Sequence, residues 1–129
     1  MPFGGAKLIL FIGPRIVVIT RDDIPTIPWP GYLDFPGGAR DGEESAEDCV
    51  LRETFEELGL RLHSDDLVWR HLRRKNVYFA AHLPDGTDRD ITFGNEGQGW
   101  KLMEPEVFLG HPKAIPHFQD VLRLYLAEA

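Results

Sequence analysis

The chain has 129 residues, a hydrophobic content of 43% and a formal net charge of −7. This length predicts one domain over residues 1–129, and the hydrophobic content excludes a disordered chain. The acidic balance argues against a nucleic-acid surface, because phosphate backbones require clustered Lys and Arg. No apolar run approaches the length of a membrane span. A single cysteine and the lack of a charged-then-apolar leader favour a cytoplasmic protein.

The first half of the chain is predicted to contain two strands, a loop, a third strand and a helix. In chain order they cover residues 7–12, 15–20, 22–32, 33–35 and 45–58. The first two strands form a hairpin around Gly13-Pro14. Three prolines favour an ordered loop of extended type before the third strand. Gly59 stands where a left-handed residue ends a helix.

The second half is predicted to contain four strands and a closing helix. The strands cover residues 67–72, 76–83, 91–93 and 99–103, and the helix covers residues 116–127. Residues 84–87, Pro-Asp-Gly-Thr, read as a turn between two of these strands. Pro116 suits the first turn of the last helix. This order of strands and helices predicts an α/β domain.

Residues 38–60 carry the most informative pattern in the chain. Between positions 41 and 57 eight side chains are acidic and only Arg52 is basic. At roughly 100° per residue, Glu53, Glu56 and Glu57 share one face of the helix. Carboxylates this close repel one another unless a cation neutralises them. Hard oxygen ligands suit Mg²⁺, with Mn²⁺ as the alternative, so the pattern predicts a metal site.

The remaining residues of this segment receive structural interpretations. Leu51, Phe55 and Leu58 lie opposite the acids and are predicted to anchor the helix to the core. Cys49 is interpreted as a small buried hydrophobe, since a lone thiol among carboxylates is not activated. Glycines before the helix let the backbone approach a ligand closely, and Glu44 is expected to approach the same metal from the helix start.

The spacing within residues 38–60 resembles the signature of the Nudix hydrolases, G-x5-E-x7-R-E-U-x-E-E-x-G-U, where U is a bulky aliphatic residue. Every fixed letter is matched, and the one departure is Thr54 at the first U position. The Phe-Pro-Gly-Gly lead-in and the later Glu96-Gly97-Gln98 resemble the MutT-like branch. The resemblance implies the Nudix fold, a mixed β-sheet sandwiched between α-helices.

The same resemblance implies roles for individual residues. The implied metal ligands are the Gly38 carbonyl and the carboxylates of Glu53, Glu56 and Glu57. Arg52 is expected to orient the glutamates rather than to take part in the chemistry. Glu96 is the first candidate for the general base, because an acid between glycines is more exposed than a structural role requires. Glu56 is the competing candidate, and the sequence leaves this choice open.

The implied reaction is Mg²⁺-dependent hydrolysis of a nucleoside diphosphate linked to another moiety. Nucleoside triphosphates rank first as substrates, and this class includes oxidised and other non-standard nucleotides. Their hydrolysis would give a nucleoside monophosphate and pyrophosphate. Dinucleoside polyphosphates and nucleotide sugars are the alternatives, while ADP-ribose ranks lower because Asn76 stands where such enzymes usually carry a proline. A messenger-RNA cap is disfavoured by the acidic balance. A non-catalytic nucleotide sensor ranks last because all box glutamates are retained.

Three side chains are candidate substrate contacts. Arg21 follows a strand and could bind a phosphate, although an ordinary surface charge explains it equally well. Tyr78 lies in the window where dinucleoside polyphosphate hydrolases often place a tyrosine. Gln119 aligns loosely with a base-reading amide of MutT-like enzymes. Stacking and pocket-facing candidates are Trp29, Tyr32, Trp100 and His117. The expected assembly is a monomer or homodimer.

Overall fold

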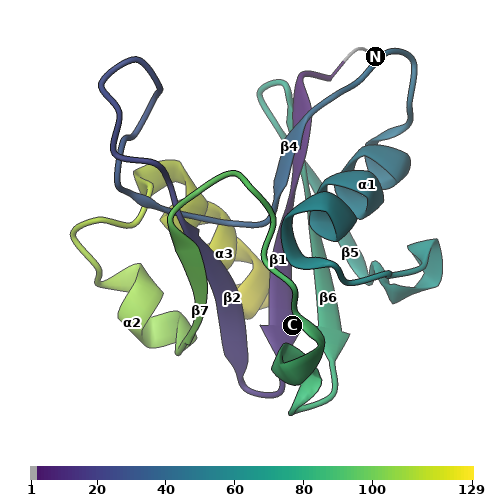
Figure 1. Cartoon of the computed structure of the whole chain (residues 1–129). Helices are drawn as coiled ribbons and strands as arrows, with labels where there is room; N and C mark the ends of the chain where they lie inside the picture. The colour runs from purple at the N-terminus through teal and green to yellow at the C-terminus, as the bar shows by residue number, and fades with distance from the viewer. Residues whose placement is uncertain (1–2) are drawn as a thin grey trace.

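The computed structural model describes residues 3–129 and contains a seven-stranded sheet with helices on both faces (Figure 1). The central path runs β3 (Leu33–Asp34), β2 (Arg15–Thr20), β1 (Gly5–Ile12), β6 (Asn76–Leu83) and β5 (Trp69–Arg73). In addition, β4 (Gly37–Ala39) pairs with β1, and β7 (Gly99–Met103) pairs with β2. The β1–β6 pair is parallel and the other pairs are antiparallel. The predicted α/β fold, with a mixed sheet between helices, is confirmed.

The central strands are buried on both faces, which explains their nearly unbroken apolar sequence. In β1, Leu8 and Leu10 belong to the cluster that packs under α1 (Ala46–Leu58). Ile9 and Phe11 belong to the opposite cluster, under α3 (Pro116–Glu128) and the short α2 (Pro105–Leu109). Because successive side chains of a strand point to opposite faces of the sheet, β1 contributes residues to both hydrophobic clusters.

Helix α1 begins and ends close to the predicted residues because both of its caps are local. Ser45 is the N-cap, and its hydroxyl accepts a hydrogen bond from the Asp48 N–H at 3.1 Å. Gly59 has a φ of 69° and donates its N–H to the Phe55 carbonyl at 2.8 Å. This left-handed cap confirms the predicted end of the helix.

The buried stripe of α1 differs from the predicted one. It consists of Ala46, Cys49, Val50, Thr54 and Leu58. Phe55 is 39% exposed, and the Arg61 guanidinium lies 4.0 Å from the centre of its ring. The prediction that Phe55 anchors the helix was therefore wrong, because the helix sits on the sheet about a quarter turn away from the assumed orientation.

The segment predicted as strand 91–93 is not a strand. It follows the 3₁₀ helix η2 (Thr87–Asp90), and its N–H groups bind the end of α1. Thr92 donates to the Leu58 carbonyl and Gly94 to the Glu57 carbonyl, each at 2.9 Å. These bonds satisfy helix carbonyls that lack partners within α1, so the segment's donors are not available to a sheet.

Short elements account for the remaining differences from the sequence prediction. Strand β4, helix α2 and the 3₁₀ helix η1 (Ser64–Asp66) were not predicted, because three to five residues carry no clear periodicity. Residues 22–32 form turns instead of an extended loop, and Trp29 has a φ of 52°. No helix within residues 3–129 has the length and apolar character needed to cross a membrane.

The hydroxyl of Thr54 is a local defect in the core. Thr54 is fully buried, and within residues 3–129 its Oγ1 has no hydrogen-bond partner. Thr54→Val keeps the shape and removes the unsatisfied hydroxyl, so we expect the free energy of unfolding to rise by about 1 kcal/mol. Denaturant unfolding measures this change. Thr87→Val is the control, because its hydroxyl donates to the Pro84 carbonyl at 2.6 Å. An unchanged or lowered stability of Thr54→Val would contradict the prediction.

Candidate active site

A hollow of about 320 Å³ lies between α1 and the loop that precedes β7. It is lined by Glu53, Glu56 and Glu57 from the helix and by Asn95 and Glu96 from the loop. A neighbouring hollow of about 290 Å³ shares Glu57 and Glu96 and extends to Arg21 and Asp34. The fold therefore brings Glu96 to the helix acids, although 39 positions separate it from Glu57 in the chain.

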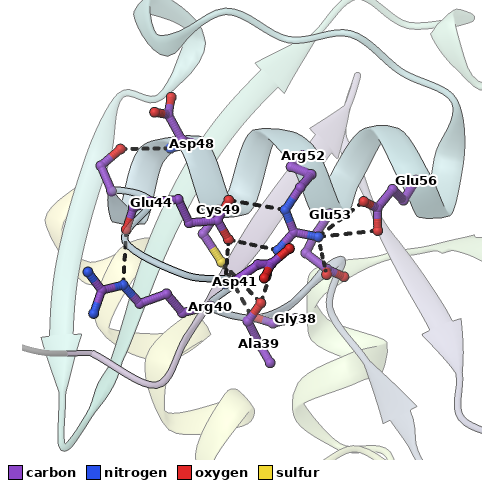
Figure 2. A network of polar contacts seen from close by, with 11 residues as sticks. Gly38, Ala39, Arg40, Asp41, Glu44, Asp48, Cys49, Arg52, Glu53 and Glu56 are labelled. Carbon is purple, nitrogen blue, oxygen red and sulfur yellow. Dashed lines mark hydrogen bonds and ion pairs between the residues drawn. The ribbon is translucent and has the colours of Figure 1, made fainter.

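Arg52 occupies the centre of a polar network on the exposed side of α1 (Figure 2). Its Nη1 donates to the Glu53 carboxylate at 2.8 Å and to Glu56 Oε2 at 3.1 Å. Its Nη2 donates to the Ala39 carbonyl at 3.1 Å. One guanidinium thus holds two acids and ties the helix to β4, and the supporting role predicted for Arg52 stays a prediction.

The same network changes the interpretation of Glu44. The two oxygens of its carboxylate accept from Arg52 Nη2 at 2.7 Å and Nε at 3.1 Å (Figure 2). The hydrogen bonds from Arg52 lower the pKa of Glu44 to about 2. Glu44 also accepts from the Asp41 N–H at 2.8 Å, so it closes the loop before α1. The expectation that Glu44 approaches the metal stays a prediction, and the bidentate ion pair with Arg52 gives its carboxylate a structural role.

Glu57 is the acid most affected by its surroundings. Burial raises its pKa to about 8, although the Gly37 N–H donates to Oε1 at 2.7 Å and Lys7 lies nearby. Burial also raises the pKa of Glu53 against the opposing effect of Arg52, and the charge of Glu96 contributes to this rise. Both acids therefore stand in a place that favours proton or cation binding.

Gly38 lies in direct contact with Glu53. A Cβ at Gly38 would overlap the Glu53 carboxylate, so only glycine allows this approach. The Cys49 Sγ lies 3.6 Å from the Gly38 carbonyl oxygen. Burial raises the pKa of Cys49 to about 11, in agreement with the buried, unreactive thiol that was predicted.

The donor set of the hollow fits a hard divalent cation. It consists of carboxylate and carbonyl oxygens, which suit Mg²⁺ or Mn²⁺ better than softer metals. Within residues 3–129, no group of three or more His, Cys, Asp or Glu side chains is arranged so that it could hold a metal ion. Arg52 holds Glu53, and the Gly37 N–H holds Glu57. Open Mg²⁺ sites use few protein ligands and complete their coordination with waters and substrate phosphates.

The loop carrying Glu96 is attached at both ends. At one end it binds the last turn of α1 through Gly94, as described above. At the other end Gln98 Nε2 donates to the Arg21 carbonyl at 2.8 Å, and the Gly97 N–H contacts Asp22 at 3.3 Å. Between these anchors, Glu96 is exposed and makes no hydrogen bond or ion pair with residues 3–129. Its carboxylate therefore has no partner among the described residues at the edge of the hollow.

Arg21 belongs to a buried ionic cluster that the sequence did not reveal. Asp34 is only 6% exposed and lies between Arg21 Nη1 at 2.9 Å and Lys7 Nζ at 3.0 Å. Lys7 Nζ also donates to the carbonyls of Phe35 and Gly37. Lys7 thus binds the Gly37 carbonyl, and Glu57 accepts from the Gly37 N–H. The sequence did contain one signal for this cluster, since Lys7 is an isolated lysine inside an apolar strand. A buried charge is costly unless it is paired, so such a lysine requires an acidic partner.

The structure places the other predicted substrate contacts less directly. Tyr78 is 1% exposed and packs edge-on against Phe118, with ring centres 5.7 Å apart, so it reaches a hollow only at its edge. Its role stays a prediction. Gln119 Nε2 donates to three carbonyls, those of Phe108, Leu109 and His111. Its amide binds the end of α2, an element that was not predicted, and its base-reading role loses geometric support.

Aromatic candidates occupy two different environments. Trp29 is 38% exposed and leans on Tyr32 and His117, with ring centres 5.1 and 6.2 Å apart. Trp100 packs against the core cluster under α1. Of the predicted stacking candidates, Trp29 therefore has the more accessible ring.

The raised pKa of Glu57 makes a prediction about metal-free stability. An acid whose pKa is 4.5 when unfolded and about 8 when folded binds more protons in the folded state between these values. Stability therefore falls as pH rises from about 4.5 to 8, by at most about 1.4 kcal/mol per pH unit. Glu57→Gln should be more stable than wild type at pH 8 in chelator and should lose this slope. Denaturant unfolding at several pH values measures both effects. Glu47→Gln, an exposed acid of the same helix, should keep the slope, and an unchanged slope in Glu57→Gln would contradict the assignment.

Comparisons with known proteins agree with this geometry. A family model described as the NUDIX domain matches residues 3–125. "Nudix hydrolase 3" of Caenorhabditis elegans is 36% identical over 66 residues, which is 51% of this chain but only 27% of that protein.

Two solved structures share the fold over most of both chains. The MutT protein from Methanosarcina mazei Go1 superposes with a TM-score of 0.70 at 19% identity, covering 98% of this chain and 95% of that one. A C. elegans Ap4A hydrolase in a binary complex gives a TM-score of 0.70 at 21% identity, covering 95% and 94%. Because the family model spans nearly the whole chain, the protein belongs to the Nudix family.

Proposed function

We propose that the protein hydrolyses a nucleoside diphosphate linked to another moiety, with a nucleoside triphosphate, including an oxidised or non-standard one, as the first candidate. The products would be a nucleoside monophosphate and pyrophosphate. The observation that carries the proposal is the hollow in which Glu53, Glu57 and Glu96 meet. Family membership and the MutT-named structural neighbour support the same class of reaction.

Glu53, Glu56 and Glu57, with the Gly38 carbonyl, are the proposed ligands of a divalent cation, with Mg²⁺ as first choice and Mn²⁺ as second. Such a cation supplies charge neutralisation for phosphate oxygens and makes water more acidic. The chain's own contribution is to fix these acids in place. Arg52 orients the Glu53 carboxylate. The Gly37 N–H binds the Glu57 carboxylate, and Lys7 binds the Gly37 carbonyl.

Glu96 is the proposed general base, and its surroundings support it over Glu56. The Glu56 carboxylate is bound to Arg52 at 3.1 and 3.3 Å, and its side chain is 55% exposed. Glu96 borders the same hollow without such a partner among the described residues. A general base must reach the attacking water, and the place of Glu96 at the edge of this hollow supports that role for it. Arg21 lines the adjoining hollow with Glu57 and Glu96 and is the proposed phosphate contact.

Dinucleoside polyphosphates are the second candidate class, because one structural neighbour is an Ap4A hydrolase. A hydrolysis screen with Mg²⁺ distinguishes the classes. It should include nucleoside triphosphates, oxidised nucleotides, nucleotide sugars and dinucleoside polyphosphates, with phosphate, pyrophosphate and monophosphate measured separately. Pyrophosphate release from triphosphates supports the first class. The proposal fails if no substrate turns over with either Mg²⁺ or Mn²⁺.

A further inference from the structure

A second groove leads away from Gly38 on the side of the sheet that faces α3. Its first part is a hollow of about 320 Å³ that includes Lys7, Arg21, Gly38, Asn76 and His117. Its second part, of about 210 Å³, is lined by Arg73, Arg74, Asn76, Tyr78 and His117. Asn76 and His117 belong to both parts, so the groove runs from the predicted metal-binding glycine to two arginines.

The arginines lie in the turn between β5 and β6. This turn lies at the same end of the sheet as the loop after β2 (Figure 1). The run Arg73-Arg74-Lys75 places three cations in succession in a chain whose net charge is −7. Arg73 is 3.6 Å from Asp120, whereas Arg74 forms no ion pair with residues 3–129. The positive charge of this turn is therefore only partly neutralised.

The conformation of Arg74 does not explain why an arginine stands there. Its φ is 56°, a left-handed conformation in a two-residue turn, where Gly or Asn is favoured. The turn would form at lower cost with another residue.

The field of the two arginines extends into the groove. Burial lowers the pKa of His117, and the charges of Arg73 and Arg74 lower it further, while Asp34 and Asp120 act in the opposite direction. His117 lies where the two parts of the groove join. At the Gly38 end, Lys7 and Arg21 both pair with the buried Asp34.

We propose that this groove holds the nucleoside part of the substrate and that Arg73 and Arg74 bind an additional phosphate monoester on its ribose. The first part of the groove is at the lower end of the size range of small-molecule sites, which suits about one nucleoside. A phosphate beyond it would be separate from the diphosphate that is cleaved. Paired guanidinium groups match phosphate oxygens in charge and in geometry. This inference rests on the proposed hydrolase function and specifies its substrate class.

Two matched substrate pairs test the proposal by kcat/KM. NADPH and NADH differ by a 2′-phosphate, and coenzyme A and dephospho-coenzyme A differ by a 3′-phosphate. We expect wild type to prefer the phosphorylated member of at least one pair by about tenfold or more, and the preferred pair identifies the position of the phosphate. In the variant Arg73→Gln/Arg74→Gln this preference should fall to about one, while turnover of the unphosphorylated member stays the same.

Arg70→Gln is the matched control. Arg70 lies in the same strand but contacts Glu47 of α1 at 3.1 Å, on the other face of the sheet, so the preference should persist. Equal turnover within both pairs by wild type overturns the inference. So does a double variant in which both members of a pair lose activity equally.

Binding separates this inference from the proposed function. Calorimetry with adenosine 2′,5′-bisphosphate, adenosine 3′,5′-bisphosphate and adenosine 5′-monophosphate requires no turnover. We expect at least one bisphosphate to bind wild type about tenfold more tightly than the monophosphate, and the double variant to lose this difference. Equal affinities for all three probes overturn the arginine site, whatever the hydrolysis screen shows. Absence of hydrolysis with retained bisphosphate preference overturns only the proposed reaction.

Discussion

Glu57→Gln will lower kcat/KM by about 10²-fold or more at saturating Mg²⁺, equivalent to about 2.7 kcal/mol of transition-state stabilisation. Gln keeps the size of the side chain and an oxygen that can still accept the Gly37 N–H, whose distance to Glu57 is 2.7 Å. The substitution therefore removes the charge and leaves the packing in place. Glu53→Gln should have a similar effect, since its oxygen can still accept from Arg52.

Steady-state kinetics at several Mg²⁺ concentrations measures this effect and shows whether metal affinity falls with it. Glu47→Gln is the control on the same helix, because Glu47 is exposed and pairs with Arg70 on the side away from the hollow. It should keep wild-type kinetics. If both Glu53→Gln and Glu57→Gln retained more than about a tenth of wild-type turnover, these carboxylates would not be the metal ligands.

Glu96→Gln will lower kcat by about 10²-fold or more with little change in KM, in the range for the loss of a general base. The helix acids are engaged by Arg52 and by the Gly37 N–H, whereas Glu96 borders the hollow from the opposite side. Removing its charge should spare substrate binding because Arg21 and the cation ligands remain. The rate should also lose its dependence on pH at the acidic end.

The pH dependence of kcat for Glu96→Gln and Glu56→Gln, measured side by side, distinguishes the two candidate bases. Glu106→Gln provides the control, since Glu106 is an exposed acid at the start of α2 and lines none of the hollows around Glu96. It should behave as wild type. If Glu56→Gln removed the acidic limb while Glu96→Gln kept wild-type kinetics, the base would belong to α1.

The sequence alone determined the features that depend on neighbouring residues. The caps of α1 at Ser45 and Gly59 are formed by hydrogen bonds within one or two turns, so its ends could be predicted within a residue. The shared face of Glu53, Glu56 and Glu57 follows from helix geometry alone. The two long central strands were also predicted, because burial on both faces requires a continuous apolar run.

Tertiary structure decided which partner each charged group found. Glu44 was assigned to the metal because its spacing allows either role, and only the approach of the pre-helix loop to Arg52 made it an ion-pair partner. The cluster of Lys7, Arg21 and Asp34 joins three strands that meet only in the folded sheet. Residues 91–93 do not form the predicted strand, because Thr92 and the following Gly94 donate their N–H groups to carbonyls at the open end of α1.

The orientation of α1 on the sheet was likewise beyond sequence reasoning. Phe55 and Thr54 are adjacent, and hydrophobicity predicts that Phe55 is the buried one, yet Thr54 is at 0% exposure and Phe55 at 39%. Helix periodicity defines the angle between two side chains, but the sheet surface defines which of them faces inward. In the same way, the sequence identified Glu96 as an unusual acid, and the folded loop alone placed it opposite Glu53 and Glu57, because proximity between distant residues depends on how the whole chain packs.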